Sequence, residues 1–340
     1  MDQQEVTNLL KQGIQVSDLS TRLGMEFHLK TVRQLYEWWR VNDLVVKRKW
    51  GGLLEKPESI VYSNSEFFLP DDQIQLKVRE AVDSLKIATW NVNSIRIRLP
   101  LILSWLAEQQ PDIVCLQETK VEDFQFPEQE LREAGYSSVY SGQKSYNGVA
   151  ILSKFPFDNI RHGFSNGFDA ENKRLLSAKI EGINIICVYV PQGQTTESPK
   201  FEYKLEFLQN LATELSNSYS PDESLLLLGD INIAPDGRDV VSADEMKNRV
   251  SFHPKEHAML QQLSQWGLTD IFRKFNQDDQ QFSWWDFRTR GFEKNEGMRI
   301  DHIWVTDSMV ERCDACTIDK NNRSQPKPSD HAPVICVMQV

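Results

Sequence analysis

The 340-residue sequence lacks any apolar run close to the ~20 residues that a membrane-spanning helix requires. Its opening residues, MDQQEVTNLL, lack the charged and apolar regions of a secretory signal. Cysteine is scarce, and the five scattered residues are an odd number that does not suit a disulfide framework. We therefore expect a protein that has no membrane anchor and works in a reducing compartment.

Cys313 and Cys316 form a lone Cys-x-x-Cys pair, a spacing that zinc and redox sites share. No second cysteine or histidine pair follows at metal-site spacing, and the neighbouring residues have the pattern of an ordinary strand. We interpret the two cysteines as structural, and a zinc or redox site is the weaker alternative.

Positive charge is in deficit, because 38 Lys and Arg face 49 Asp and Glu, which gives a formal net charge of -11. Such a balance argues against a protein whose whole surface binds nucleic acid. It is compatible with a local basic track and with acidic residues around a metal. The most basic stretch is 28–49, where six cations interleave with aromatic residues: Lys30, Arg33, Tyr36, Trp38, Trp39, Arg40, Lys47, Arg48 and Lys49.

Two regimes divide the chain, and we expect a small module over 1–84 and a main domain over 85–340. In the module, apolar spacing predicts helices over 5–12, 16–23 and 29–44, followed by a hairpin between 44–50 and 59–63. Three helices and a hairpin are typical of a winged helix that docks on duplex DNA. A helical appendage packed on the main domain, with solvated lysines, explains the same pattern.

In the main domain, strands and helices alternate. The pattern predicts strands over 85–91, 113–116, 148–153, 176–180, 183–190, 225–228, 300–305 and 334–340, and helices over 99–109, 200–216 and 257–266. Glu181 and Gly182 turn two of the strands into an antiparallel hairpin. This mixture of hairpins and crossovers predicts an α/β (mixed α+β) domain of packed sheets with helices outside.

The most informative segment is Leu225–Leu228, a buried strand that ends in Gly229, Asp230, Ile231 and Asn232. Asp230 and Asn232 stand two residues apart, so they share one side of the chain. A simple turn after a core strand would explain this pair equally well. The other strands, however, have similar polar groups at or beside their ends: Asn91, Glu118, Tyr189, Asp301, and Asp330 with His331. Carboxylate and amide oxygens fit Mg²⁺ or Mn²⁺ better than zinc.

Six ordered segments resemble the motifs of the exonuclease III family of apurinic/apyrimidinic (AP) endonucleases, within the endonuclease/exonuclease/phosphatase superfamily. They are Trp90–Asn93 with Ser94 and Arg96, Leu116–Lys120, Tyr189–Gly193, Leu228–Asn232, Arg299–His302 and Lys327–Pro333. The resemblance covers about 86–340. It implies a DNase I-like fold, a four-layered α/β sandwich of two packed, mainly antiparallel sheets flanked by helices. Ser94 departs from the family glycine at a turn.

The resemblance also implies residue roles. It places one or two Mg²⁺ ions, or Mn²⁺, among Asn91, Glu118, Asp230, Asn232, Asp330 and His331, with Glu118 as the main ligand. Asp230 would activate the attacking water, and Asn232 would orient it and stabilise the developing charge. Tyr189 would lie against the phosphate. His331 would bind phosphate oxygens while donating a hydrogen bond to Asp301.

The activity that the resemblance implies is base excision repair. The enzyme would cleave the phosphodiester 5' to abasic sites in double-stranded DNA, leave a 3'-OH, and act on damaged 3' ends as a 3'–5' exonuclease and 3'-phosphatase. Trp284, Met298 and Ile300 would form a pocket for a baseless sugar, and Met298, where some relatives have a bulky aromatic residue, leaves the balance of these activities open. Further DNA contacts would come from Asn93, Arg96, Lys120, Arg174 and Gln192.

Two alternatives remain open: a phosphodiesterase or phosphatase of the same superfamily acting on RNA or other phosphoesters, and a DNA-tethering adaptor that works through the module. We expect a monomer. Its location would be the cytoplasm, in association with the nucleoid, in a bacterium, or the nucleus or a DNA-containing organelle in a eukaryote.

Overall fold

The computed structural model describes residues 44–48, 74–78 and 84–340. The chain divides into two compact units, Met1–Val82 and Asp83–Val340. In the first unit, strands β1 (Leu44–Arg48) and β2 (Ile74–Val78) pair antiparallel, with Leu44 opposite Val78. The sequence predicts a strand from Leu44 but a partner at 59–63. That partner and the three predicted helices lie outside the described residues, whereas 74–78 alternates apolar and polar residues as a strand does.

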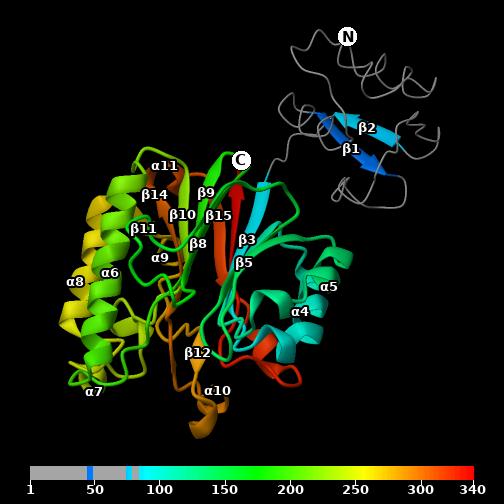
Figure 1. Cartoon of the computed structure of the whole chain (residues 1–340). Coiled ribbons are helices and arrows are strands. Elements are labelled where there is room, and N and C mark those ends of the chain that lie inside the picture. Colours follow the sequence, from blue (N-terminus) through cyan, green and yellow to red (C-terminus); the bar gives the residue numbers. More distant parts are fainter. Residues whose placement is uncertain (1–43, 49–73, 79–83) are drawn as a thin grey trace. The chain divides into compact units, whose positions relative to one another are not determined.

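The second unit contains two six-stranded sheets (Figure 1). The first has the order β15-β16-β3-β4-β6-β5. Its strands are β3 (Ser84–Asn91), β4 (Ile113–Gln117), β5 (Ser137–Ser141), β6 (Val149–Ser153), β15 (Cys313–Ile318) and β16 (Val334–Gln339). Only β3 and β4 run parallel in this sheet.

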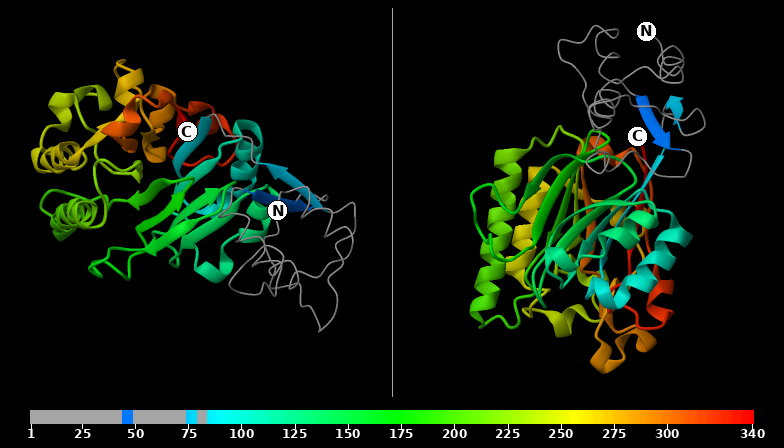
Figure 2. Two further views of the ribbon diagram at one scale, coloured as in Figure 1. Left: turned by 90° about the horizontal axis from the view of Figure 1, so that it is seen from above. Right: turned by 45° about the vertical axis from the view of Figure 1, so that its right-hand side comes forward.

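The second sheet has the order β11-β14-β10-β9-β8-β7, and only β9 and β10 run parallel. Its strands are β7 (Asp158–His162), β8 (Leu175–Ile180), β9 (Ile183–Tyr189), β10 (Leu225–Asp230), β11 (Leu268–Asp270) and β14 (Asp301–Thr306). The central strands β3 and β4 contact β9, β10 and β14, so the two sheets pack face to face (Figure 2). Every residue of β4 and β10 is buried, as the unbroken apolar runs predict.

Helices cover the outer face of each sheet. α4 (Ile95–Gln109) and α5 (Glu128–Glu133) lie outside the first sheet, and α6 (Pro199–Ser218) and α8 (Pro254–Trp266) lie side by side outside the second (Figure 1). The short helices are α7 (Ala243–Met246), α9 (Ile271–Phe275), α10 (Gly291–Lys294) and α11 (Asp307–Val310). The predicted four-layered α/β sandwich is thus confirmed.

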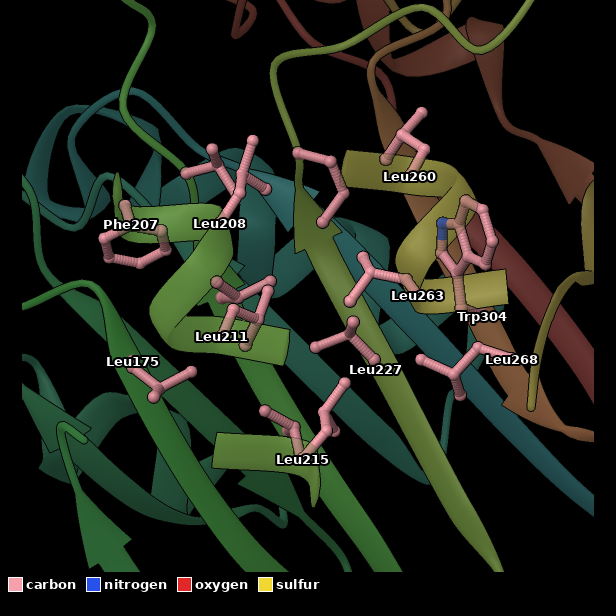
Figure 3. Close-up of a cluster of buried hydrophobic side chains, with 14 of the residues drawn as sticks. Leu175, Phe207, Leu208, Leu211, Leu215, Leu227, Leu260, Leu263, Leu268 and Trp304 are labelled. Carbon is pink, nitrogen blue, oxygen red and sulfur yellow. The ribbon is translucent and has the colours of Figure 1, made fainter. Parts of the chain in front are cut away.

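The core outside the second sheet shows why α6 and α8 form there. Leu208, Leu211 and Leu215 of α6 follow one another at helical spacing and meet Leu260 and Leu263 of α8 over the sheet (Figure 3). Ser198 caps α6 by accepting a hydrogen bond from the backbone of Lys200. Both helices therefore begin within a few residues of their predicted starts.

Helix α4 begins four residues before its predicted start at Leu99. Pro100 is typical of a first helical turn, but here it lies inside the helix. Ile95 is fully buried, so packing of the first turn offsets the backbone hydrogen bond that a proline cannot donate.

A segment that we call the 284–298 excursion projects beyond the ends of both sheets (Figure 1). It begins with β12 (Trp284–Trp285), contains a 3₁₀-helix (Phe287–Thr289) and α10, and returns through β13 (Gly297–Met298). Trp284 lies opposite Met298 in this two-stranded sheet. Within the described residues, the remaining 3₁₀-helices are Asp123–Gln125, Gly237–Asp239 and Lys320–Ser324.

Cys313 and Cys316 lie on β15, and Cys316 stands opposite Cys336 of β16. All five cysteines are free and buried, and the residue cluster that could hold a metal contains none of them. Within the described part of the chain, no helix is long and apolar enough to span a bilayer.

Candidate active site

The polar strand ends meet at one edge of the sandwich because of strand direction. β14 runs antiparallel to β10, so the start of β14 lies beside the end of β10, and Asp301 stands opposite Asp230. β9 runs parallel to β10 and places Tyr189 beside Asp230. In the other sheet, Asn91 ends β3 and β16 begins beside it, shortly after His331. Both sheets therefore deliver polar groups to the same place.

Asn91 joins the two sheets at this edge. Its Nδ2 donates hydrogen bonds to Oε1 of Glu118 and to Oδ2 of Asp230, both at 2.9 Å. Its Oδ1 accepts from the backbone N of Asn93 at 3.0 Å. The amide thus bridges two carboxylates that would otherwise repel each other. In this arrangement its nitrogen, and not its oxygen, faces the carboxylates.

Asp230 and Asn232 share one side of the chain, as their spacing predicts. Oδ1 of Asp230 accepts from the backbone N of Asn232 at 3.0 Å, and Nδ2 of Asn232 donates to the carbonyl of Val190 at 2.9 Å. Gly229 permits the close approach of strands here, because a Cβ atom at this position would lie 1.9 Å from the carbonyl oxygen of Val188. Burial raises the pKa of Asp230 to about 8, with Asp301 and Glu118 adding to the shift and His331 opposing it.

His331 is held from behind by Asp301. Its Nδ1 lies 2.8 Å from Oδ2 of Asp301, and its Nε2 lies 3.8 Å from Oδ2 of Asp230. Burial alone would lower the pKa of His331, but the two carboxylates outweigh it and raise the pKa to about 10. Ser283 fixes the orientation of Asp301 by donating from Oγ to the same Oδ2 at 2.7 Å. Nε2 of His331 therefore faces the site, as a hydrogen-bond donor when the ring is protonated and as a ligand atom when it is neutral.

Tyr189 is a neutral phenol at the end of β9. Burial, with the charges of Glu118 and Asp230, raises its pKa well above the ordinary value. The guanidinium of Arg174 lies 4.6 Å from its ring centroid, and NH1 of Arg174 donates to the Tyr189 carbonyl at 3.2 Å. The phenol can therefore donate a hydrogen bond to an anion at neutral pH.

A polar chain forms the rim of the site on the side of the first sheet. Lys120 pairs with Glu118 at 2.5 Å and donates to Oδ1 of Asn93 at 2.6 Å. Asn93 and the indole of Trp284 donate to the two oxygens of Asp330 at 2.9 and 3.1 Å. Burial would raise the pKa of Glu118, but Lys120 and Asn91 outweigh it and hold the pKa below its usual value.

These groups line a pocket of about 510 Å³. Its polar side includes Glu118, Asp230 and His331, and its apolar side is formed by Trp284, Met298 and Ile300. Gln192 and Asn232 also line it, and Lys120, Asn93 and Arg174 touch lining residues. Arg96 stands apart from the pocket lining, since its NH1 reaches Oε1 of Gln125 at 3.4 Å on the exposed surface.

Sequence reasoning missed several residues of this site. Lys204 of α6 is fully buried, pairs with Glu256, and donates to the carbonyls of Asn232 at 2.7 Å and Gln192 at 3.3 Å. A signal existed, because Lys204 falls on the apolar stripe of α6, four residues before Leu208. Ser283 had no signal beyond its place beside Trp284. Three further lining residues lie in irregular segments without a pattern: Gln194 and Ser251 in loops and Arg288 in the short 3₁₀-helix of the excursion.

The donor set fits a hard divalent cation. Ligand atoms of Glu118, Asp230 and His331 lie within 4.8 Å of one another, and in the described part of the chain this is the one such cluster. Two carboxylate groups dominate it and thiols are absent from it, a chemistry that suits Mg²⁺-type ions. A cation would also offset the repulsion between the two closely spaced carboxylates.

Comparison with known proteins agrees with this geometry. Residues 88–331 match the endonuclease/exonuclease/phosphatase family. Exodeoxyribonuclease III of Haemophilus influenzae is 37% identical over 262 residues, which cover 74% of this chain and 98% of that protein. A solved structure of an AP endonuclease from Archaeoglobus fulgidus is 38% identical, with a TM-score of 0.73, and covers 75% of this chain and 100% of its own. A 3' phosphatase from Neisseria, NExo, bound to a product DNA hairpin, is 35% identical with a TM-score of 0.72 and the same coverage. The chain belongs to the endonuclease/exonuclease/phosphatase family.

Proposed function

We propose that this protein is a Mg²⁺-dependent DNA repair nuclease that hydrolyses the phosphodiester 5' to an abasic site and leaves a 3'-OH. The observation that carries the proposal is the pocket, which combines a buried carboxylate and histidine cluster with an apolar wall. Solved relatives include an AP endonuclease and a 3' phosphatase. We therefore also propose action on damaged 3' ends, as exonuclease and 3'-phosphatase.

Each polar group has a chemical part in this reaction. Asp230 accepts a proton from the attacking water, and Asn232 orients that water and stabilises the charge that develops on the phosphate. His331 and Tyr189 donate hydrogen bonds to phosphate oxygens. Glu118 would hold Mg²⁺, with Asp230 and His331 beside it and Asn91, Asn232 and Asp330 in the surrounding set, and the ion would supply electrostatic stabilisation of the phosphate and the leaving 3' oxygen. Mn²⁺ fits the same oxygen-rich set.

Specificity would come from the apolar wall. Trp284, Met298 and Ile300 leave room for a sugar without a base, and extrusion from the duplex costs least where no base stacks. Asn93, Lys120, Arg174 and Gln192 would contact the DNA backbone near the site, while Arg96 would contact it further out. The expected partner is double-stranded DNA with an abasic site or a damaged 3' end, bound by a monomer.

A substrate panel tests the proposal. Duplex DNA with one abasic site, a duplex with a 3'-phosphate, single-stranded RNA, and inositol phosphates are each incubated with and without Mg²⁺. We expect the two DNA substrates to be hydrolysed, and only when Mg²⁺ is present. Preferred hydrolysis of RNA or of inositol phosphates would contradict the proposal and favour another phosphoesterase of the same superfamily.

We also propose that residues 1–84 form a separate DNA-tethering module. The basic and aromatic stretch over 28–49 supports this, because clustered cations interleaved with rings are typical of nucleic-acid contacts. Tethering would add to catalysis and would not replace it.

A further inference from the structure

Arg323 occupies a cage formed by three aromatic rings of the 284–298 excursion. Its guanidinium lies 4.8 Å from the ring centroid of Phe287, 4.9 Å from that of Phe292 and 5.9 Å from that of Trp285. Only 7% of the residue is exposed, and its Nε has no hydrogen-bond partner within the described structure. A guanidinium removed from water is attracted more strongly to ring faces than an exposed one.

The same side chain holds the loop that delivers His331. NH1 of Arg323 donates to the carbonyl of Ser329 at 2.8 Å. Ser329 in turn donates from Oγ to the carbonyl of Asn91 at 2.7 Å and accepts from the backbone N of His331 at 3.2 Å. The Ser329 hydroxyl thus holds this loop to Asn91 and His331 through bonds that do not involve Arg323.

The excursion is tied to this loop at its first residues. The backbone N of Trp285 donates to the Asp330 carbonyl at 3.1 Å, and the N of Ala332 donates to the Ser283 carbonyl at 2.7 Å. Further along the excursion, the rings of Phe287 and Phe292 are the groups that face Arg323. Arg323 thus contacts the rings of Phe287 and Phe292 in the excursion. It also donates a hydrogen bond to the loop that carries His331, which we call the catalytic loop.

We propose that Arg323 is a positioning residue that fixes the distance between the excursion and the catalytic loop. Trp284 and Arg288 line the pocket from the excursion, whereas Asp330 and His331 line it from the loop. Trp284 is already held to the loop by its indole bond to Asp330 and its backbone bridge to His331. The part that Arg323 keeps at a fixed spacing is therefore the segment that carries Arg288. The consequence for substrate rests on the proposed function, since a duplex would touch both walls while a small phosphodiester would touch only the catalytic side.

Arg323→Met tests this inference, because methionine fills part of the cage without the charge or the hydrogen bond. Arg161→Met is the matched control. Arg161 lies on the edge strand β7, its guanidinium is 5.9 Å from the ring centroid of Tyr219, and it is not among the residues that line the pocket. We expect Arg323→Met to raise KM for an abasic duplex about tenfold while kcat/KM for bis(p-nitrophenyl) phosphate stays within about twofold. An equal loss on both substrates, or no loss on the duplex, would overturn the inference.

Amide hydrogen exchange gives a readout that does not depend on substrate. In Arg323→Met, amides of 286–296 should exchange about tenfold faster, while those of α6 keep their wild-type rates. Unchanged exchange in the excursion would refute the positioning role.

If the wild-type protein does not cut an abasic duplex, the proposed function fails, and the exchange rates alone then decide this inference. Should Arg323→Met not fold, Arg323→Lys keeps the charge without the planar fork, and a smaller acceleration is expected there; wild-type exchange would count against the inference.

Discussion

The metal corner and the apolar wall of the pocket are built in different ways. The metal corner is the part of the site that we propose holds the ion, namely Asn91, Glu118, Asp230 and His331. It stands at or beside the ends of buried strands from both sheets, and hydrogen bonds of 2.8 to 3.0 Å fix its members. The apolar wall is formed by Trp284, Met298 and Ile300, two of which lie on two-residue strands of an excursion.

This difference teaches where the fold is rigid and where it can vary. Proton transfer and charge stabilisation lose rate steeply when groups move, so they benefit from a site anchored in the core. An apolar wall rejects a base by size and tolerates small shifts. We therefore expect substitutions in the metal corner to abolish chemistry, and substitutions in the wall to change which DNA is cut.

The largest effect should follow from Asp230→Asn. This change keeps the shape of the side chain but removes the base, so kcat on an abasic duplex should fall about 10³-fold. A neutral amide removes a buried charge whose pKa is raised to about 8, but it can accept only one of the hydrogen bonds that Asn91 and Asn232 donate to the carboxylate, so the melting temperature should change little. Steady-state kinetics and thermal unfolding measure both effects, and a fall of less than tenfold would show that Asp230 is not the base.

Metal dependence comes next in size. Chelation should abolish cleavage, and Glu118→Gln should weaken the apparent affinity for Mg²⁺ by at least the ~10- to 100-fold that loss of an outer ligand partner costs elsewhere. Activity is measured against Mg²⁺ concentration for both proteins. Glu130→Gln changes an exposed residue on α5 and is the control, and its activity should depend on Mg²⁺ concentration as that of the wild type does. An unshifted curve for Glu118→Gln would remove Glu118 from the metal corner.

A smaller effect, confined to selectivity, is expected from Met298→Ala. The shorter side chain enlarges the pocket and should reduce the preference for abasic over normal nucleotides about tenfold, a factor typical of the discrimination that apolar pocket contacts provide. The rate at which the protein removes a 3'-phosphate should change little, because the substitution leaves the metal corner intact. Met246→Ala, which trims the same apolar cluster outside the pocket lining, is the control. If Met298→Ala lowers both activities equally, the corner and the wall are not separable.

The smallest effect should come from deleting residues 1–82. If the module contacts phosphates, duplex affinity should fall and the slope of log affinity against log salt should shrink by about 0.9 for each lost contact. The rate at saturating DNA should stay unchanged, since the metal corner lies wholly within 83–340. Fluorescence anisotropy across a salt series provides the measurement, and an unchanged slope would leave the module without a role in DNA binding.

Much of the main domain could be predicted because its strands are continuous apolar runs and its helices have clear stripes. Leu225–Leu228 and the hairpin around Glu181 and Gly182 appear in the structure as predicted. The convergence of Asp230 with Glu118 was less accessible, since it depends on the pairing of strands far apart in the chain. The family motifs supplied what local patterns could not.

The unpredicted residues act through the backbone or in irregular segments. Lys204 and Arg323 hold carbonyl groups of Asn232 and Ser329, and sequence does not show which carbonyls a buried cation will meet. Arg288 reaches the pocket from the excursion, whose path depends on ring contacts and not on a repeating pattern. The pairing of Leu44 with Val78 was likewise not predicted, because strand pairing is a choice between distant segments.

The most direct test of the account uses a duplex with a single tetrahydrofuran abasic analogue, labelled at both ends of the damaged strand. This analogue cannot undergo β-elimination, so a cut must arise by hydrolysis. The account predicts one Mg²⁺-dependent cut on the 5' side of the analogue, leaving a 3'-OH. No cut in Mg²⁺, or a cut on the 3' side, would contradict it.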